Sequence, residues 1–216
     1  NEHNELKTKF IRNISSQMEP TLNTLGTSAK ELSAQAPRCA EQMQAQVAAL
    51  KQFSDNIQEL SSLENSLTEP YEMGEVNAGT FCESVMEKAK EFIKPDVTPS
   101  VNAPKLQVKT NKEQLERILL YLLKNAAFYT EQGRISLDFK KRGAHTHQFI
   151  ITDTGTGIPA EQQENLFKPF TQVKDLTTGD GLGLPICSLI ATKMNGSLTL
   201  DTSYTKGCRF ILELHA

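Results

Sequence analysis

Asp153 ends the apolar run FIIT and is followed by Gly155 and Gly157 at intervals of two residues. A carboxylate at the end of a strand can accept a hydrogen bond from the exocyclic amine of a purine. Glycines directly after it let the backbone approach a ligand closely, because no Cβ stands in the way. Asp and Gly are also the commonest turn residues, so this segment alone fits an ordinary surface turn equally well.

A second glycine segment, residues 179–183, precedes the apolar run LPICSLIATKM, for which we expect a helix. The unpaired amides and the positive dipole end at the start of such a helix can receive phosphate groups. Between the two glycine segments, Phe167 and Phe170 are expected to anchor a loop by burial. Residues 174–178 would then be free to close over a bound ligand.

Tyr121, Asn125 and Tyr129 recur every fourth residue, so a helix over this region places an amide and two aromatic rings on one face. An amide oxygen can ligate Mg²⁺, which prefers oxygen ligands and keeps most of its waters, so one Asn plus phosphate groups is a sufficient site. Tyr129 can stack on a base. For this helix alone, a capping or backbone-satisfying Asn between two core tyrosines is the favoured interpretation.

Residues 1–69 carry two apolar stripes with helical spacing, separated by AQAPRC, whose Pro37 cannot continue a helix interior. We therefore expect a helical hairpin. Its stripes leave apolar surface that a second copy would cover in a dimeric four-helix bundle; a coiled-coil spacer without chemistry fits the same pattern. The stripes are Leu6, Phe10, Ile14, Met18, Leu22, Leu25, Ala29 and Leu32, and Met43, Val47, Leu50, Phe53, Ile57, Leu60, Leu63 and Leu67.

Residues 70–216 form the second expected domain, because helix and strand patterns alternate after Pro70. The predicted class is α+β, with the hairpin followed by a two-layer α/β sandwich that has a mixed sheet and helices on one face. Asn111 is the expected N-cap of a helix. The patterns predict helices at 77–94 and 111–130, a strand at 106–110, and antiparallel hairpins pairing 134–142 with 147–153 and 197–204 with 208–215.

The composition excludes several functional classes. The net charge of −3 and the even spread of 23 Lys and Arg residues indicate no nucleic-acid surface. The four cysteines lie far apart without a CxxC pair, which favours free thiols over a disulfide framework or a zinc site. No apolar run approaches the ~20 residues of a membrane span. The chain begins at Asn1 inside a helical pattern, so we expect it to be part of a longer protein with any sensor or membrane segment upstream.

Four segments, NAAFYT, DTGTGIP, LFKPF and GDGLGLPI, resemble the N, G1, F and G2 boxes of the histidine-kinase ATPase domain, which has the GHKL or Bergerat ATP-binding fold. The similarity covers most of residues 76–216. The hairpin resembles the dimerisation and phosphoacceptor domain of the same sensor kinases, including QELSSLEN at the end of its second helix. The chain is therefore similar to the core of a two-component sensor histidine kinase over nearly its whole length.

The resemblance implies a set of roles. Asn125 would hold Mg²⁺, Asp153 would bind the adenine amine of ATP, and Tyr129 would lie against the base. A histidine on the first helix would take the γ-phosphoryl group and pass it to an aspartate of a response-regulator receiver domain. The family also implies a homodimer and a cytoplasmic position in a membrane-bound sensor. The implied ATP-binding residues are Asn125, Tyr129, Asp153, Gly155, Gly157, Ile158, Lys174, Gly179, Gly181, Leu182 and Gly183.

The chain departs from the family at the residues that perform the chemistry. The run SSQMEPTLN stands where the family carries SHExRTPLN, so Ser16 occupies the phosphoacceptor position and Gln17 replaces the adjacent acid. Pro20 replaces a residue linked to phosphatase activity. In the ATPase domain, Tyr121 replaces the first Asn of the N box and Phe128 replaces a basic residue. Autophosphorylation is therefore doubtful for this chain, and lowered nucleotide affinity is expected.

Two functions from different classes follow from this pattern. One is a histidine kinase core whose acceptor has been removed, naturally or by engineering. The other is a pseudokinase, an ATP-responsive dimeric module that binds partners without transferring phosphate. An ATPase of the chaperone or topoisomerase type would need a transducer domain and a catalytic acid in the N box, where this chain has Tyr121. That third interpretation is disfavoured.

Overall fold

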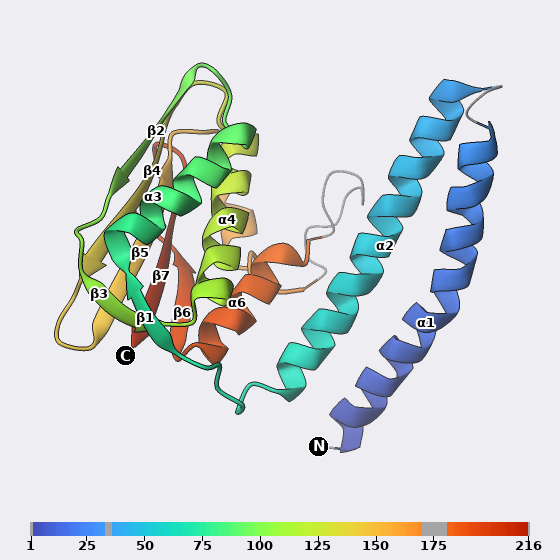
Figure 1. Cartoon of the computed structure of the whole chain (residues 1–216), viewed down its shortest axis with the longest axis horizontal. Coiled ribbons are helices and arrows are strands. Elements are labelled where there is room, and N and C mark those ends of the chain that lie inside the picture. The colour runs from blue at the N-terminus through green and yellow to red at the C-terminus, as the bar shows by residue number, and fades with distance from the viewer. Residues whose placement is uncertain (1, 33–35, 170–180, 216) are drawn as a thin grey trace. The chain divides into compact units, whose positions relative to one another are not determined.

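The computed structural model describes residues 2–32, 36–169 and 181–215 (Figure 1). Contacts between Cα atoms divide the chain into two compact units. One is drawn from Asn1–Leu67 with Leu166–Ile186, and the other from Thr68–Asn165 with Cys187–Ala216. The domain boundary between residues 69 and 70 stays a prediction.

An antiparallel helical hairpin forms the N-terminal part of the chain. Gly26 faces Val47, where a Cβ on the glycine would lie 3.6 Å from the valine side chain. The ammonium of Lys51 donates to the amide oxygen of Asn23. These contacts join residues on either side of the turn and confirm the predicted hairpin. The helices are α1 (Glu2–Glu31) and α2 (Pro37–Asn65).

The buried face of α1 differs in part from the predicted stripe. Leu22 is buried as expected, but so is Ser15, while Ile14, Leu25 and Leu32 are each about two-fifths exposed, at 41%, 42% and 40%. Ser15 and Leu22 lie seven residues apart and share one side of the helix, whereas Ile14 is rotated from Ser15 by about 100°. Ile14 therefore lies off the buried side of α1 in the single chain, and apolar surface remains uncovered on this helix.

A mixed five-stranded sheet forms the main layer of the second unit, in the order β2-β4-β5-β7-β6. Strands β2 and β4 are parallel, and the other neighbours are antiparallel. Both hairpins predicted from the sequence are present, as β4–β5 and β6–β7. The bounds are β2 Val97–Asn102, β4 Gly133–Lys141, β5 Thr146–Asp153, β6 Gly196–Leu200 and β7 Arg209–His215.

Helices α3 and α4 pack over one face of this sheet (Figure 1). Each begins at an Asn whose side chain accepts a backbone N–H three residues on, from Thr80 to Asn77 and from Gln114 to Asn111. The N-cap predicted at Asn111 is thus confirmed. The bounds are α3 Ala78–Ala89, a 3-10 turn Lys90–Phe92, α4 Lys112–Tyr129, α5 Ala160–Gln163 and α6 Gly183–Lys193.

Two strands were not predicted from the sequence. Strand β1 (Gly74–Asn77) pairs with β3 (Gln107–Thr110) in a separate two-stranded sheet. Strand β2 contains Pro99, which removes a hydrogen-bond donor and argues against a strand interior. It is tolerated because β2 is an edge strand with β4 as its one sheet neighbour.

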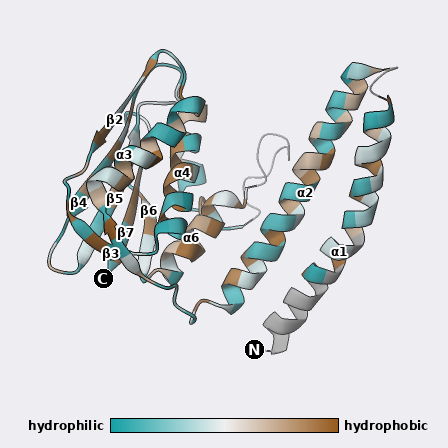
Figure 2. Ribbon diagram, in the orientation of Figure 1, coloured by the Kyte–Doolittle hydropathy of each residue, from teal (hydrophilic) through white to brown (hydrophobic). Residues whose placement is uncertain are grey.

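The core forms between the sheet and its helices, and Figure 2 shows apolar residues along the central strands and on α4. On β5, Phe149 and Ile151 are fully buried, and Ile150 between them is buried as well. Because side chains on a strand alternate between faces, Asp153 continues the series of Phe149 and Ile151 toward the helical layer. All four cysteines are free, as predicted: Cys39 is exposed, and Cys82, Cys187 and Cys208 are buried.

Candidate functional site

The carboxylate of Asp153 is buried, at 4% exposure, at the end of β5. Its Oδ1 atom accepts two backbone N–H groups, from Gly155 at 2.8 Å and from Cys208 at 3.2 Å. Among the described residues, no donor contacts Oδ2. Burial raises the pKa of the carboxyl, and the two backbone donors oppose that shift. One oxygen is thus fixed by the protein, and the other is left to accept a hydrogen bond from a ligand.

The loop after Asp153 lies against the C-terminal end of α4. The backbone N–H of Thr156 donates to the carbonyl of Tyr129 at 3.2 Å. A Cβ added at Gly155 would lie 2.4 Å from the same carbonyl oxygen and 2.8 Å from the hydroxyl of Thr130. Only glycine fits at position 155 without displacing backbone. In the structure the close approach at Gly155 is to the end of α4, and the predicted approach to a ligand stays a prediction.

Helix α4 has a buried face and, beside it, a face that is partly open. The buried face packs on the sheet, and the face that carries Tyr121, Asn125 and Tyr129 is partly open, with Tyr129 53% exposed. The amide of Asn125 makes no side-chain hydrogen bond within the described part of the chain. The amide oxygen of Asn125 is partly exposed and can therefore serve as a ligand of a Mg²⁺ ion whose other ligands are waters and phosphate oxygens. The buried face consists of Leu115, Ile118, Leu119, Leu122, Leu123, Ala126 and Ala127.

Phe128 is the most exposed large apolar residue of this region, at 62%. Its ring packs edge to face on Tyr129, with ring centroids 4.9 Å apart. The two rings form an aromatic corner at the end of α4, beside the loop that follows Asp153. A flat aromatic group can stack there without meeting a charge from position 128.

Gly207 lies in the β6–β7 loop, between the segments predicted to pair at 197–204 and 208–215, and was not among the predicted site residues. A Cβ at this position would lie 2.1 Å from the carbonyl oxygen of Asp153 and 2.9 Å from its Oδ1. Gly157, with φ 72°, lies opposite, and its Cβ would be 3.4 Å from the carbonyl of Gly207. Two glycines thus allow the β6–β7 loop to lie directly against the carboxylate.

This packing can be tested with a matched pair of substitutions, Gly207→Ala and Gly143→Ala. Both glycines have φ 147°, so an alanine meets the same backbone strain at each position, but nothing lies within 4 Å of a Cβ at Gly143. We expect Gly207→Ala to lower the free energy of unfolding by about 1–3 kcal/mol more than Gly143→Ala does. Urea denaturation measures the difference. Equal losses would mean that the Asp153 backbone yields freely to the added methyl group.

The second glycine segment is described from Gly181 onward. Gly181 has φ 68°, a conformation that favours glycine, and Leu182 is fully buried just before α6 begins at Gly183. Ile158 is partly buried, and its carbonyl accepts the side-chain N–H of Gln163 at 2.8 Å. Lys174 and Gly179, two of the predicted nucleotide ligands, lie outside the described residues, as does Phe170.

Ser16 is exposed on α1, next to the buried Ser15. The side chain of Gln17 lies outside the described part of the structure. An exposed position is accessible to an incoming group, but a serine hydroxyl needs a base to lose its proton before it can act as a nucleophile. The adjacent Gln17 carries an amide, which cannot serve as that base.

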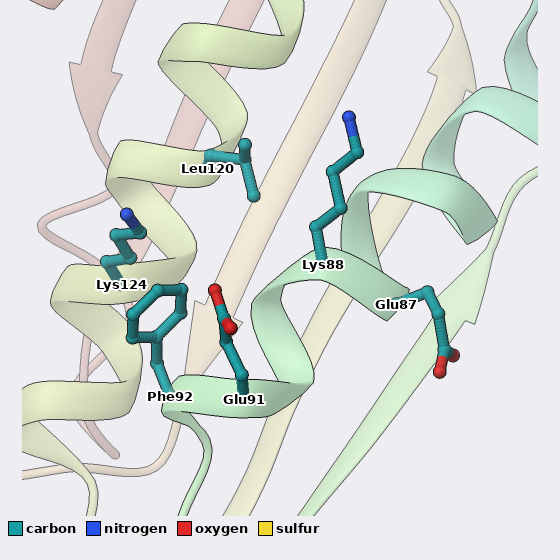
Figure 3. Close-up of a pocket in the computed structure, with 6 residues that line it drawn as sticks. All are labelled: Glu87, Lys88, Glu91, Phe92, Leu120 and Lys124. Carbon is teal, nitrogen blue, oxygen red and sulfur yellow. The ribbon is translucent and has the colours of Figure 1, made fainter.

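A separate hollow of about 310 Å³ lies between α3, the 3-10 turn and α4 (Figure 3). Lys124 lies over the ring of Phe92, 4.3 Å from its centroid, and Lys88 pairs with Glu116. Leu120, Lys124 and Phe128 share the α4 face beside the one that carries Asn125, so this hollow is distinct from the Asp153 site. Its lining residues are Glu87, Lys88, Glu91, Phe92, Leu120 and Lys124.

Among the described residues, no three His, Cys, Asp or Glu side chains gather in a way that could hold a metal ion. Within the same residues, no helix is both long and apolar enough to cross a membrane.

Comparison with known families defines the class of domain. Residues 110–216 match the family model described as histidine kinase-, DNA gyrase B- and HSP90-like ATPase, and this part of the chain belongs to that family. The match contains α4, the Asp153 loop and the segment around Gly181. The ATPase domain predicted from the four sequence boxes is confirmed.

The relatives narrow the class to sensor histidine kinases. The chain is 25% identical to the aerobic respiration control sensor protein ArcB of Escherichia coli K12, over 97% of this chain and 29% of ArcB. It is 34% identical to the sensor histidine kinase RcsC of Salmonella typhimurium, over 57% of this chain and 13% of RcsC. The chain thus spans less than a third of the length of either relative.

The fold agrees with solved structures. The crystal structure of full-length ShkA in complex with AMPPNP superposes with a TM-score of 0.77 and 20% identity, over 95% of this chain and 45% of that one. The predicted α+β class, with a helical N-terminal region and a mixed sheet, is confirmed. The resemblance to sensor histidine kinases with a GHKL ATPase domain is confirmed by the family match and the relatives together.

Proposed function

We propose that the chain binds MgATP at the end of α4 and that Asp153 recognises the adenine amine. The observation that supports this most directly is that the two carboxylate oxygens differ. Oδ1 accepts hydrogen bonds from the backbone N–H groups of Gly155 and Cys208, and Oδ2 has no donor among the described residues. A carboxylate oxygen that the protein leaves without a donor can accept one from a ligand. The family to which residues 110–216 belong supports ATP as that ligand.

The remaining roles follow from the same geometry. Asn125 would ligate Mg²⁺, which neutralises phosphate charge when bound, and Tyr129 with Phe128 would lie against the base. Gly155, Gly157 and Ile158 would border the nucleotide on the β5 side. On the phosphate side, the positions proposed are Lys174, Gly179, Gly181, Leu182 and Gly183.

We further propose that this ATPase domain belongs to a homodimeric kinase core that transfers phosphoryl groups to a histidine and then to a response-regulator receiver domain, although position 16, where that histidine is expected, is a serine in this chain. Support for the dimer comes from the exposed apolar residues Ile14, Leu25 and Leu32 on α1, which a second hairpin would cover. Membrane attachment, where present, would come through segments upstream of this chain. No nucleic-acid partner is proposed.

A second candidate, a pseudokinase, is favoured by one specific observation. Ser16 is exposed where the acceptor histidine is expected, while Asp153, Gly155 and Gly157 of the ATPase domain match the family. Such a protein would bind nucleotide and a partner without transferring phosphate. Nucleotide binding is common to both candidates, so it is tested first.

Replacing Asn125 with alanine tests the proposed magnesium site. Because Asn125 would be the one protein ligand of the ion, we expect Asn125→Ala to weaken ADP binding in Mg²⁺ by about tenfold or more, and to leave the weaker binding measured in EDTA unchanged. Isothermal titration calorimetry with ADP in both buffers gives the comparison. Asn102→Ala, on the exposed edge strand β2, is the matched control. A chain that binds no ADP at millimolar concentration would overturn the proposed function.

A further inference from the structure

Side chains on the face of the sheet opposite the helical layer form a network that contacts the backbone of Asp153. The hydroxyl of Tyr204, in the β6–β7 loop, donates to the carbonyl oxygen of Asp153 at 3.1 Å. The carboxylate of Asp153 points toward the helical layer, so Tyr204 contacts this residue on the side away from the ligand. The ring of Tyr204 in turn lies under the guanidinium of Arg209, whose Cζ is 4.2 Å from the ring centroid.

Arg209 is itself fixed at two further points. Its Nε donates to the hydroxyl of Thr152 at 3.2 Å, directly across the β5–β7 ladder, and its guanidinium pairs with Asp201 at 3.3 Å. The hydroxyl of Ser203 donates to Asp201 and lowers the pKa of that carboxyl, so Asp201 stays ionised opposite Arg209. The planar guanidinium can make these polar contacts and stack on the ring at the same time.

The backbone of the same loop completes the support. The N–H of Asp153 donates to the carbonyl of Cys208 at 2.9 Å, and the N–H of Cys208 donates back to Asp153 Oδ1 at 3.2 Å. The position of the carboxylate therefore depends on where the β6–β7 loop sits. Among the described residues, Tyr204 is the one side chain of that loop that forms a hydrogen bond with Asp153, and Arg209 restrains its ring.

We propose that Tyr204, braced by Arg209, is a positioning residue that sets the orientation of the Asp153 carboxylate and thereby the selectivity of the site for adenine over hypoxanthine. The inference rests on the proposed function, since it assumes that Oδ2 accepts the adenine amine. Hypoxanthine carries a carbonyl oxygen in place of that amine and cannot donate to Oδ2. The ratio of ADP to IDP affinity therefore reports how well Oδ2 is aimed.

The test compares ADP and IDP binding to the full chain and to Tyr204→Phe by calorimetry. Removing the hydroxyl deletes one hydrogen bond and keeps the ring under Arg209, so the fold should be retained. We expect ADP to bind about three- to tenfold more weakly while IDP binding changes little, which lowers the ADP to IDP ratio by the same factor. Tyr71→Phe, in which the tyrosine contacts Lys193 instead, is the matched control and should leave the ratio unchanged.

Each outcome decides between named alternatives. An unchanged ratio in Tyr204→Phe overturns the positioning role, and so does an equal loss of ADP and IDP affinity, which would mean that the loop only supports the fold. A wild-type chain that binds both nucleotides equally, or neither, overturns the proposed recognition of adenine and this inference with it. Arg209→Gln provides a second variant, because loss of the brace should lower the ratio in the same direction even though the Tyr204 hydroxyl remains.

Discussion

Asp153→Asn is expected to weaken ADP binding by about 100-fold and to reverse the preference between ADP and IDP. The substituted amide must direct its oxygen to the Oδ1 position, because two backbone N–H groups donate there. Its NH₂ group then occupies the Oδ2 position and faces the adenine amine, so that two donors oppose each other. A hydrogen bond to a charged acceptor is lost and a buried donor is left unpaired, which together correspond to an effect of this size.

The same amide NH₂ matches the carbonyl oxygen of hypoxanthine, and for this reason IDP should bind the variant better than ADP does. Competition calorimetry with both nucleotides measures the reversal. Asp138→Asn, on the neighbouring strand β4 where the carboxylate accepts from Ser136 at 2.8 Å, is the control and should behave as the unmodified chain. If Asp153→Asn keeps the ADP preference, the carboxylate does not read the base.

The unfolding free energy of Asp153→Asn shows whether weaker ADP binding comes from the lost hydrogen bond or from a destabilised fold. The pKa of Asp153 is raised by burial, so the folded chain binds this proton more tightly than the unfolded chain does. The ionised carboxylate therefore costs stability as the pH rises through the raised pKa, and an uncharged amide avoids that cost. The unfolding free energy of Asp153→Asn at neutral pH should accordingly not fall below that of the unmodified chain. For the same reason, ADP affinity of the unmodified chain should fall as the pH is lowered through that raised pKa.

The apolar pattern of the sequence predicted the type of those helices and strands that have a well-defined apolar segment or face. The strands that carry Phe149 and Phe210 contain short apolar runs, and α4 has one continuous apolar face, so their type and pairing could be inferred. Strand β2 could not, because its pairing with β4 depends on an edge position that tolerates Pro99. The buried face of α1 was predicted less well, because small residues such as Ser15 occupy positions that face the hairpin partner.

Some residues of the candidate site could likewise be recognised from the sequence, and others could not. Asp153 and Gly155 could be found from the sequence because a carboxylate and glycine follow a strand in a short motif. Gly207 and Tyr204 lie some fifty residues away in sequence, as the bond between Tyr204 and Asp153 shows, and only the β5–β7 pairing brings them to the carboxylate. A Gly in a turn and a Tyr in a loop carry no local signal of that role.

Ser16→His should turn the chain into a phosphoprotein if the kinase proposal is correct. An imidazole nitrogen is a competent nucleophile at neutral pH, whereas the serine hydroxyl needs a base that Gln17 cannot provide. The γ-phosphoryl group would pass to that nitrogen, with the terminal P–O bond broken, ADP released and the imidazole proton lost to solvent. We expect at least about tenfold more label from γ-labelled ATP and Mg²⁺ than on the unmodified chain, removed by acid because a phosphorus–nitrogen bond is acid-labile.

The control for this experiment is Ser62→His, which places a histidine at an exposed position on α2 instead of α1 and should take no label. Adding Asp153→Asn to Ser16→His should abolish the signal, which ties it to the proposed nucleotide site. Binding of ADP by the Ser16→His variant without any label would exclude a missing acceptor as the sole defect. The pseudokinase would then be the better account, and Tyr121 and Phe128, where the N box departs from the family, would be the residues to revert next.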